Sequence, residues 1–326
     1  MKEISVSNLK KYYSVYKRSS GLVAAFGSLF KRSYHQVQAV DDISFDISAG
    51  ELVGFIGPNG AGKTTTLKCL AGLLHPTQGK IDVCGYYPFD RKTDFLKRIS
   101  LVMGQKNQLW WDLPAIETFR LNKEIYEIED DIFEKTLKEL TNLLEIGDLI
   151  GLPTRQLSLG QRMKMELIAS LIHRPKILFL DEPTIGLDVV MQKKIRDFIL
   201  SYNRRFKATI LLTSHYMTDV KRLCKRIIII DRGKIIYDGE LDKLAKSLID
   251  VKSVSLVFGQ KILKNEISEL GKITIFDLPK VVLSVPRDRV SIVASKILKK
   301  YKIDDLTIEE PEIEEVIRMV FDRKTK

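Results

Sequence analysis

A nine-residue segment, 57–65, has the residue types needed to bind the phosphates of a nucleotide. Its glycines allow consecutive backbone N–H groups to converge on an anion without interference from side chains. Lys63 can reach the β- and γ-phosphates, and the Thr64 hydroxyl can bind Mg²⁺. The spacing Gly-x4-Gly-Lys-Thr is typical of such loops. The segment predicts phosphate-binding residues at Gly57, Pro58, Asn59, Gly60, Ala61, Gly62, Lys63, Thr64 and Thr65.

The elements on either side of this loop must hold it in place. The apolar run 52–56 predicts a buried strand, and residues 66–74 predict a helix. A helix that starts after the loop adds the partial positive charge of its N-terminus to the site. The alternative, a glycine-rich turn that binds nothing, is disfavoured because the full spacing and both flanking elements are present.

Polar residues also follow three other short apolar segments that are predicted to be strands. Gln105 follows the first, Asp181 and Glu182 follow the second, and His215 follows the third. Open α/β sheets bind ligands at the carboxyl ends of their strands, so these residues are expected to gather around the phosphate loop. Asp181 is suited to hold Mg²⁺ through water, and Glu182 to act as general base for an attacking water.

The signature segment 157–161, Leu-Ser-Leu-Gly-Gln, completes a set of motifs that resembles the ATP-binding cassette (ABC) ATPases, which drive ABC transporters. The resemblance covers residues 1–240 and is specific, because other P-loop ATPases lack the signature segment. The connection after Tyr13, the segment 105–112 and the C-terminal region are similar to a bacterial subfamily. Its members pair with separate ABC-2-type membrane subunits, usually as exporters. The resemblance therefore implies an ATPase that couples ATP hydrolysis to transport.

The implied fold is α/β: a P-loop NTPase (RecA-like) core with an antiparallel β-subdomain and an inserted α-helical subdomain. Residues 113–149 carry helical spacing and many charges, so the helical subdomain is expected at about 105–165. The ATPase domain is expected over residues 1–240. Near Gly239 the pattern changes to short strands and amphipathic helices, which predicts a small α+β accessory or regulatory domain over residues 241–326.

The resemblance also implies roles for single residues. Segment 57–65 corresponds to the Walker A motif, and Tyr12 to the residue that stacks on adenine, with Tyr13 as the alternative. Gln105 corresponds to the residue that contacts Mg²⁺ or its water and reports to the membrane subunit. His215 corresponds to the switch histidine, which contacts the γ-phosphate. The implied catalytic set is Glu182, His215, Gln105 and Lys63, and the implied metal-binding set is Thr64, Gln105 and Asp181.

Further residues are implied to act between two cassettes that face each other head to tail, each either this chain or a homologous ATPase subunit. Ser158 and Gly160 of one subunit bind the γ-phosphate of the ATP held by the other, and Asp188 crosses the interface. Leu159 stands where the family usually has glycine, but Ser158 and Gln161 still fit a capping box that opens a helix. The implied nucleotide-binding set therefore also contains Ser158, Gly160, Gln161 and Asp188.

Composition and charge limit the location and the partners. The 326 residues contain no apolar run near the roughly 20 residues that span a bilayer, and the N-terminus lacks the apolar core of a signal peptide. A cytoplasmic protein, peripheral on the inner face of the cell membrane, is expected. The net charge of +11 suits an anionic surface, but nucleic acid is not expected because no basic stripe with interleaved aromatics is present. Three isolated cysteines support neither a metal site nor a disulfide framework.

Two features leave alternatives open. The connection 14–35 contains apolar residues in helical spacing at 22–30, which predicts a helix that either rests on a membrane or partner or packs on its own domain. Trp110 and Trp111 either dock a membrane subunit or pack in the core of the helical subdomain. A cassette ATPase that acts on ribosomes or DNA is disfavoured by the single Walker A motif and the short insertion before the signature. A non-catalytic module is disfavoured by the presence of Glu182 and His215.

Overall fold

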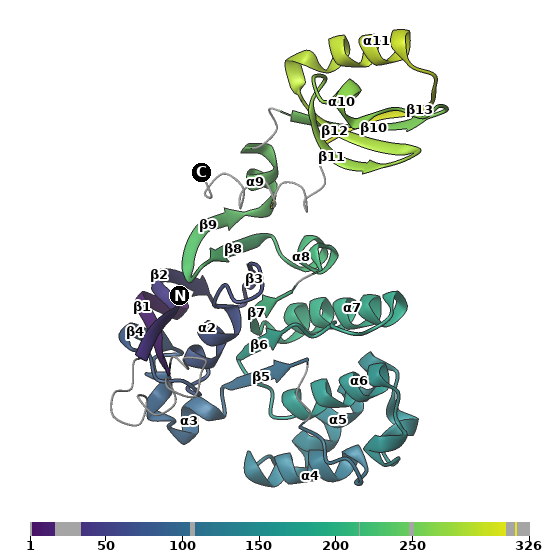
Figure 1. Cartoon of the computed structure of the whole chain (residues 1–326). Helices are drawn as coiled ribbons and strands as arrows, with labels where there is room; N and C mark the ends of the chain where they lie inside the picture. Colours follow the sequence, from purple (N-terminus) through teal and green to yellow (C-terminus); the bar gives the residue numbers. More distant parts are fainter. Residues whose placement is uncertain are drawn as a thin grey trace, which may run out of the picture. The chain divides into compact units, whose positions relative to one another are not determined.

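Six strands form the central sheet of the chain, whose computed structural model is shown in Figure 1. They lie in the order β5-β6-β7-β3-β8-β9, and neighbours from β5 to β8 pair in parallel. Parallel strands are buried on both faces, which explains their nearly continuous apolar sequences. The predicted strands 52–56, 99–103 and 209–213 are confirmed to the residue. The strands are β3 (Leu52–Ile56), β5 (Ile99–Met103), β6 (Ile177–Asp181), β7 (Thr209–Thr213), β8 (Arg226–Asp231) and β9 (Lys234–Glu240).

The structure describes residues 2–16, 34–104, 108–214, 216–247, 251–310 and 317. The predicted helix at 22–30, Gln105 and His215 lie outside these residues. The chain forms two compact units, Met1–Asp238 and Gly239–Lys326. Among the described residues, no helix is both long enough and apolar enough to cross a bilayer.

A second sheet, which is antiparallel, has the order β2-β1-β4. The connection expected over 14–35 is wrong at both ends, because residues 14–16 pair with residues 34–36 and extend the two strands. Val15, Tyr16 and Tyr34 have high strand propensity, although no alternating apolar pattern marks them. The strands are β1 (Lys2–Tyr16), β2 (Tyr34–Ser48) and β4 (Gln78–Val83).

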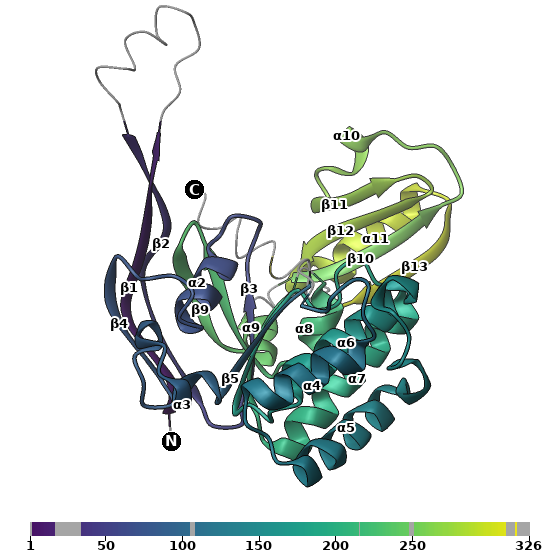
Figure 2. The ribbon, with the colours of Figure 1, turned by 90° about the horizontal axis from the view of Figure 1, so that it is seen from below.

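Helix α2 (Lys63–Leu70) packs between the two sheets, and its apolar side chains share one core with theirs. Helix α2 begins at Lys63, before the predicted start at 66, and ends at Leu70, before the predicted end at 74. Gly72 follows it with a φ of +70°, and a Cβ there would lie 2.2 Å from the Pro88 carbonyl oxygen, so the chain must turn. Helices α7 (Val189–Phe206) and α8 (Met217–Leu223) cover the opposite face of the central sheet (Figure 2).

Three helices between β5 and β6 form the predicted helical subdomain: α4 (Ala115–Ile125), α5 (Asp130–Leu144) and α6 (Leu159–Leu171). Helix α6 packs against α4, α5 and β5, which explains why most of its side chains are buried. It extends beyond the expected limit near 165, so the signature segment and the contact with the central sheet belong to one helix. Short helices are η1 (Pro88–Asp90), α3 (Thr93–Leu96), η2 (Gly147–Leu149) and η3 (Thr154–Gln156).

The second unit contains an antiparallel sheet of order β11-β12-β10-β13. Together with α10 and α11 this is a β-α-β-β-α-β arrangement of the ferredoxin-like type. Apolar residues of the sheet and of α11 form its own core, as the short strands and the helical pattern predicted. The elements are α9 (Leu241–Ser247), β10 (Val251–Phe258), α10 (Lys264–Ile267), β11 (Lys272–Asp277), β12 (Lys280–Pro286), η4 (Arg287–Arg289), α11 (Val290–Lys300) and β13 (Ile303–Glu309).

Candidate functional site

The loop before α2 folds around the Lys63 side chain. The Lys63 ammonium donates hydrogen bonds to the carbonyl oxygens of Gly57 (2.7 Å) and Pro58 (3.0 Å), and the residue is 5% exposed. Burial lowers the pKa of Lys63, whereas the nearby carboxylates of Glu182 and Asp181 raise it. A buried cation in a glycine-rich loop at a helix N-terminus is suited to bind a phosphate.

Close backbone contacts require two glycines in this loop. Gly62 has a φ of +111°, and a Cβ there would lie 2.4 Å from the carbonyl oxygen of Ala39 on β2. A Cβ at Gly57 would lie 2.1 Å from the carbonyl oxygen of Ile230 on β8. The loop is therefore pressed against one strand of each sheet, which fixes its shape.

Asp181 ends β6 and meets two hydroxyl groups. Its Oδ2 accepts a hydrogen bond from Thr64 Oγ1 (2.8 Å), and its Oδ1 accepts one from Thr213 Oγ1 (2.6 Å). The structure thus brings together Thr64 and Asp181, the two described residues that the sequence linked to Mg²⁺. Hydroxyl and carboxylate oxygens are ligands that Mg²⁺ prefers, so the pair fits this metal. Sequence reasoning missed Thr213, because its contact with Asp181 depends on the pairing of β7 with β6.

Glu182 follows Asp181 with a backbone φ of +56°, which is uncommon for a residue with a side chain. The Glu182 N–H donates to the carbonyl oxygen and to the hydroxyl of Thr213, both at 3.1 Å. Gly104, the residue before Gln105, packs against the backbone of Glu182, since a Cβ on Gly104 would lie 2.3 Å from the Glu182 carbonyl oxygen. Backbone strain of this kind occurs at catalytic sites, where surrounding contacts maintain it.

Tyr12 is connected to the phosphate loop by a chain of hydrogen bonds. Its hydroxyl donates to Asp41 Oδ1 (2.5 Å), and the Asp41 N–H donates to the Gly233 carbonyl oxygen (2.8 Å). The Gly233 N–H in turn donates to the Ala61 carbonyl oxygen (2.9 Å). The hydrogen bond between the side chains raises the pKa of Tyr12 and lowers that of Asp41. Successive strand residues point to opposite faces, so Tyr13 is directed away from Asp41.

Helix α6 begins at the signature segment, and the predicted capping box is confirmed. The Gln161 N–H donates to Ser158 Oγ (3.2 Å), and the Ser158 N–H donates to Gln161 Oε1 (2.9 Å). Leu159 occupies the first helical position and is 42% exposed, so the residue that replaces the usual glycine is accommodated at the surface. A Cβ at Gly160 would lie 2.8 Å from the Met191 side chain of α7.

The segment 185–188, here called the D-loop, ends in Asp188, which caps α7 by accepting a hydrogen bond from the Met191 N–H (2.9 Å). Leu159 of the signature segment lies against this loop, because a Cβ on Gly186 would be 3.4 Å from its side chain. The first two residues of α7, both valines, are 76% and 68% exposed. The D-loop and the signature segment therefore lie side by side on one apolar surface.

The phosphate loop and the signature helix occupy different parts of the chain (Figure 1). The loop follows β3, whereas α6 packs against β5, and β7 and β6 lie between those two strands. Three strand spacings amount to roughly 14 Å. One chain thus presents Lys63, Asp181 and Glu182 at one place, and Ser158 and Gly160 at another.

A buried network connects the segments that follow β6 and β7. Asp219 of α8 is fully buried and accepts hydrogen bonds from Thr184 (2.5 Å), Ser214 (2.9 Å) and Arg196 (2.7 Å). Thr184 lies two residues after Glu182, and Ser214 directly precedes the predicted switch histidine. A buried carboxylate with these partners fixes both segments. Sequence reasoning missed all four residues of the network.

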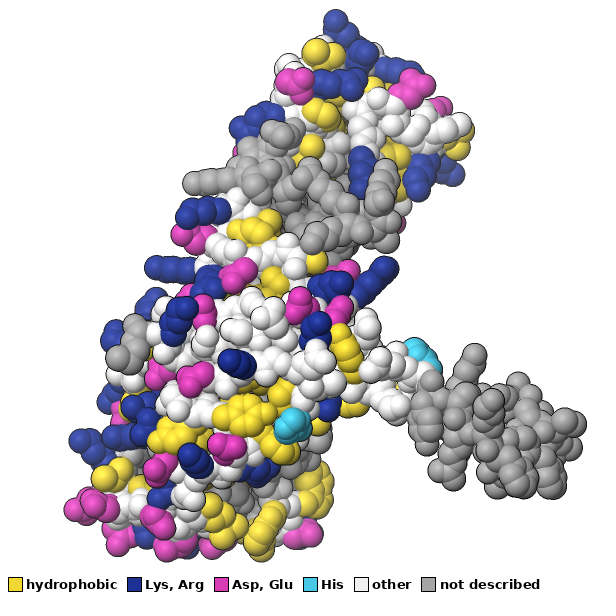
Figure 3. Space-filling view, turned by 90° about the vertical axis from the view of Figure 1, so that its left-hand side faces the viewer, with side chains coloured by type: hydrophobic (Ala, Val, Ile, Leu, Met, Phe, Trp, Pro, Cys, Tyr) yellow, Lys and Arg dark blue, Asp and Glu magenta, His cyan; other side chains and the backbone are white. Residues whose placement is uncertain are grey.

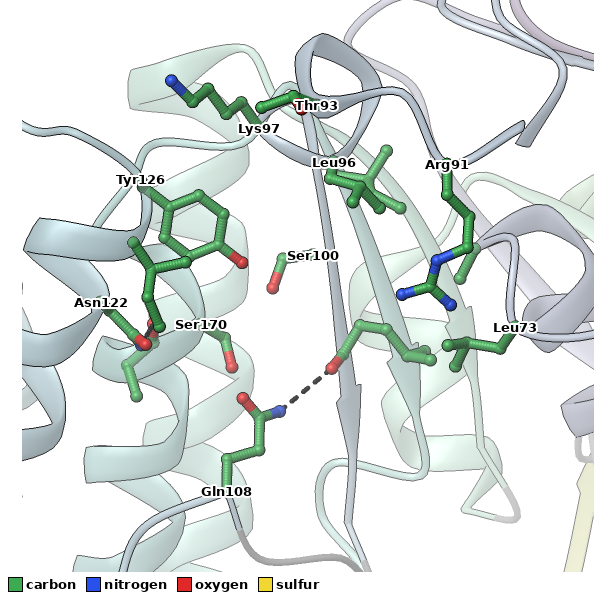
Figure 4. A pocket seen from close by; sticks show the side chains of 15 residues that line it. Leu73, Arg91, Thr93, Leu96, Lys97, Ser100, Gln108, Asn122, Tyr126 and Ser170 are labelled. Carbon is green, nitrogen blue, oxygen red and sulfur yellow. Dashed lines mark hydrogen bonds between the residues drawn. The ribbon is translucent and has the colours of Figure 1, made fainter. Parts of the chain in front are cut away.

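A cavity of about 400 Å³, here called the groove, lies between β5 and the helical subdomain (Figure 4). Its wall includes apolar side chains from both sides, such as Leu96 and Ile125, and the basic residues Arg91 and Lys97. Gln108 forms part of the same wall. The groove is therefore a mainly apolar recess with basic residues in its lining.

The two tryptophans lie close after Gln108 in sequence. Trp110 is 56% exposed and Trp111 is 51% exposed, so the alternative that they pack in the helical core is wrong. The Arg162 guanidinium lies 5.6 Å from the centroid of the Trp111 ring. Large exposed aromatic side chains are typical of protein interfaces.

Comparison with known proteins agrees with this geometry. Residues 40–185 match the family described as ABC transporter, and residues 250–309 match that described as EvrA-like ABC transporter, C-terminal domain. The ABC transporter ATP-binding protein NatA of Bacillus subtilis is 36% identical over 211 residues, 65% of this chain and 85% of NatA. The Nod factor export ATP-binding protein I of Cupriavidus pinatubonensis is 32% identical over 232 residues, 71% of this chain and 70% of that protein.

The fold also recurs in a solved dimeric structure of the ATP-binding cassette MJ0796, in a post-hydrolysis state with ADP and Pi. The TM-score is 0.60 at 22% identity, and the match covers 73% of this chain and 98% of that one. This likeness confirms the P-loop NTPase fold expected from the motifs. By its relatives and its fold, the chain belongs to the ATP-binding subunits of ABC transporters, and it is an ATPase.

Proposed function

We propose that two copies of this chain, or one copy and a homologous subunit, form a head-to-tail dimer that hydrolyses ATP to drive transport through separate membrane subunits. One observation carries the proposal: Lys63 and Asp181 lie at one place on the chain, and the signature residue Ser158 lies at another. Two complete sites form if each chain supplies the half that the other lacks. The dimeric cassette MJ0796 supports this arrangement.

Each proposed site uses one chain for the phosphates and for the attacking water. Lys63 and the N–H groups of the loop bind the β- and γ-phosphates. Thr64 and Asp181, together with Gln105, hold Mg²⁺, which neutralises charge on the phosphates when it is bound. Glu182 accepts the proton of the water that attacks the γ-phosphate. Its strained backbone, hydrogen-bonded at the end of β7, keeps the carboxylate in position.

The remaining proposed contacts close the site from the other side. Ser158 and Gly160 of the partner subunit approach the γ-phosphate with the N-terminus of α6, whose capping box with Gln161 orders it. His215 contacts the same phosphate, and Asp188 crosses the interface. The adenine stacks on Tyr12, which the hydrogen bond to Asp41 orients.

The groove is the proposed docking site of an ABC-2-type membrane subunit. Its apolar lining, with the guanidinium of Arg91, suits an amphipathic segment that carries an acidic side chain. Trp110 and Trp111 extend the surface available to such a partner. Opening and closing of the ATPase dimer would then move the membrane subunits through this contact.

Export and a location on the inner face of the cell membrane are part of the proposal. A relative is named as a Nod factor export protein, which supports export as the direction. On the face shown in Figure 3, Lys and Arg side chains are interspersed with Asp and Glu, which favours a protein partner over nucleic acid. The region 241–326 is proposed to be an accessory or regulatory domain that follows the ATPase domain 1–240 in the sequence.

The substitution Glu182→Gln tests this function. It should lower ATP hydrolysis by roughly 10²–10⁴-fold, because the general base is lost while the phosphate contacts remain. The variant should also elute as a dimer with ATP and Mg²⁺ and as a monomer without nucleotide. Glu134→Gln, at an exposed carboxylate on α5, is the matched control. Unchanged hydrolysis would sink the general-base role, and a monomer at saturating ATP would sink the dimer.

A further inference from the structure

Gln108 makes hydrogen bonds to two elements at once. Its backbone N–H lies 2.9 Å and 3.0 Å from the two carboxylate oxygens of Glu166 on α6. Its side-chain amide donates to the Leu101 carbonyl oxygen on β5 (3.1 Å), the bond drawn as a dashed line in Figure 4. Gln108 therefore joins the signature helix to the edge strand of the central sheet.

Glu166 is the anchor of this connection on the helix. It is 3% exposed, and it also accepts a hydrogen bond from the Leu109 N–H (3.2 Å). A buried carboxylate is costly unless such donors surround it, so these contacts hold the backbone at residues 108–109 firmly. Glu166 lies eight residues after Ser158, which is about 12 Å along one helix. A shift of Glu166 therefore moves the signature residue with it.

The Leu101 end of this connection leads along β5 to the backbone contact with Glu182. Leu101 lies three residues before Gly104, whose backbone packs against the Glu182 carbonyl oxygen. We propose that Gln108 and Glu166 are positioning residues: they form a clasp that sets the signature helix relative to β5 and so determines where Ser158 stands for dimer closure. This inference rests on the proposed head-to-tail dimer. Because Gln108 also lines the groove, a partner seated there would act on the clasp directly.

Two variants separate the halves of the clasp. Gln108→Ala removes the bond to Leu101 but keeps the backbone N–H that Glu166 accepts. Glu166→Gln keeps the size of the side chain but replaces one accepting oxygen by an NH₂ group. This donor cannot accept the hydrogen bonds of the Gln108 and Leu109 N–H groups. Gln78→Ala on β4 and Glu134→Gln on α5, both at exposed positions, are the matched controls.

The clasp variants should bind ATP as monomers with the parental Kd, because Lys63 and the phosphate loop are untouched. Their kcat should fall by roughly 3–30-fold, and the ATP concentration that dimerises the Glu182→Gln background should rise by a similar factor. The double variant should be no worse than the more affected single one, since both act on one connection. Gln108→Glu should be worse than Gln108→Ala, because its carboxylate faces the Leu101 carbonyl oxygen.

Parental kcat and parental dimerisation in Gln108→Ala would overturn the clasp, and so would fully additive effects in the double variant. A loss of monomer ATP binding together with a lower Tm would show a purely structural role and would also overturn it. If Glu166→Gln does not fold, the two Gln108 variants decide the matter. If ATP fails to dimerise the Glu182→Gln parent, the dimer proposal fails and the clasp fails with it. If the parent dimerises and the Gln108 variants behave as it does, only the clasp fails.

Discussion

The Thr64 hydroxyl donates a hydrogen bond to the Asp181 carboxylate, with 2.8 Å between the two oxygens. This bond joins the first turn of α2 to the end of β6. Thr213 holds the second carboxylate oxygen from the end of β7. The ends of β6 and β7 and the helix that follows β3 therefore meet at one carboxylate, which is the reason to expect a magnesium ion there.

Asp181→Asn should lower the affinity for Mg²⁺ in the presence of ATP by roughly 10–100-fold, because the amide keeps the size but loses the charge. A Mg²⁺ titration of bound fluorescent ATP measures this. Binding of the nucleotide in EDTA should stay at the parental level, since Lys63 and the loop are unchanged. Thr213→Val should give a smaller loss in the same titration. A parental Mg²⁺ dependence in Asp181→Asn would contradict the metal assignment.

Much of the carboxyl edge of the central sheet could be predicted, because the sequence patterns that specify it are local. The strands β3, β5 and β7 are short apolar runs followed by glycine or polar residues, and their limits followed directly. The rule that parallel sheets collect ligands at their carboxyl ends then placed Asp181 near Thr64, 117 residues away. The capping box of Ser158 and Gln161 was equally local, since both residues belong to one helix turn.

The partners that connect elements could not be predicted, because they depend on which strands and helices become neighbours. Thr213 meets Asp181 only because β7 lies beside β6. Glu166 meets Gln108 only because α6 packs against β5. The predicted ends of β1 and β2 were wrong for a related reason. Pairing between residues 14–16 and 34–36 extends both strands beyond any alternating sequence pattern.

Tyr12 and Tyr13 can be distinguished by nucleotide binding. Tyr12→Ala should weaken ATP binding by roughly 5–150-fold, the range of a lost base–aromatic stack, whereas Tyr12→Phe keeps the ring and should lose less. Tyr13→Ala should bind like the parent, and inorganic tripolyphosphate should bind equally to all variants. Calorimetric titration measures these affinities. A larger loss in Tyr13→Ala than in Tyr12→Ala would transfer the role to Tyr13.

His173 should make the protein less stable in mild acid. Burial lowers its pKa to about 4, although the bond from its Nε2 to the Ile99 carbonyl oxygen (3.1 Å) opposes the shift. The ring stacks on Tyr126 at 3.8 Å, and its Nδ1 is buried without a partner among the described residues. Because the folded pKa lies below the unfolded value of about 6.5, the neutral form is favoured on folding. This contribution is complete above pH 6.5 and is lost as the pH falls towards 4.

The loss should reach about 3 kcal/mol of unfolding free energy, from the difference between the two pKa values. Urea unfolding at a series of pH values between 7 and 4 measures it. His173→Phe keeps the stack on Tyr126 and removes the titrating group, so its stability should fall less steeply with pH. His75→Phe, at an exposed histidine, should keep the parental slope. Parallel curves for His173→Phe and the parent would contradict the prediction.

Leu159 should contribute to dimer closure. It is 42% exposed beside the D-loop, next to two exposed valines, and a partner cassette that approaches Ser158 would cover it. Burying the exposed part of one leucine contributes about 1 kcal/mol, and a symmetric dimer contains two copies. In the Glu182→Gln background, Leu159→Asp should therefore weaken ATP-dependent dimerisation by at least roughly 30-fold. The Kd of the monomer for ATP and its Tm should stay unchanged. Leu152→Asp, at a leucine 39% exposed on the helical subdomain, is the matched control. Equal dimerisation of the Leu159 variant and this control would mean that Leu159 faces solvent in the closed dimer.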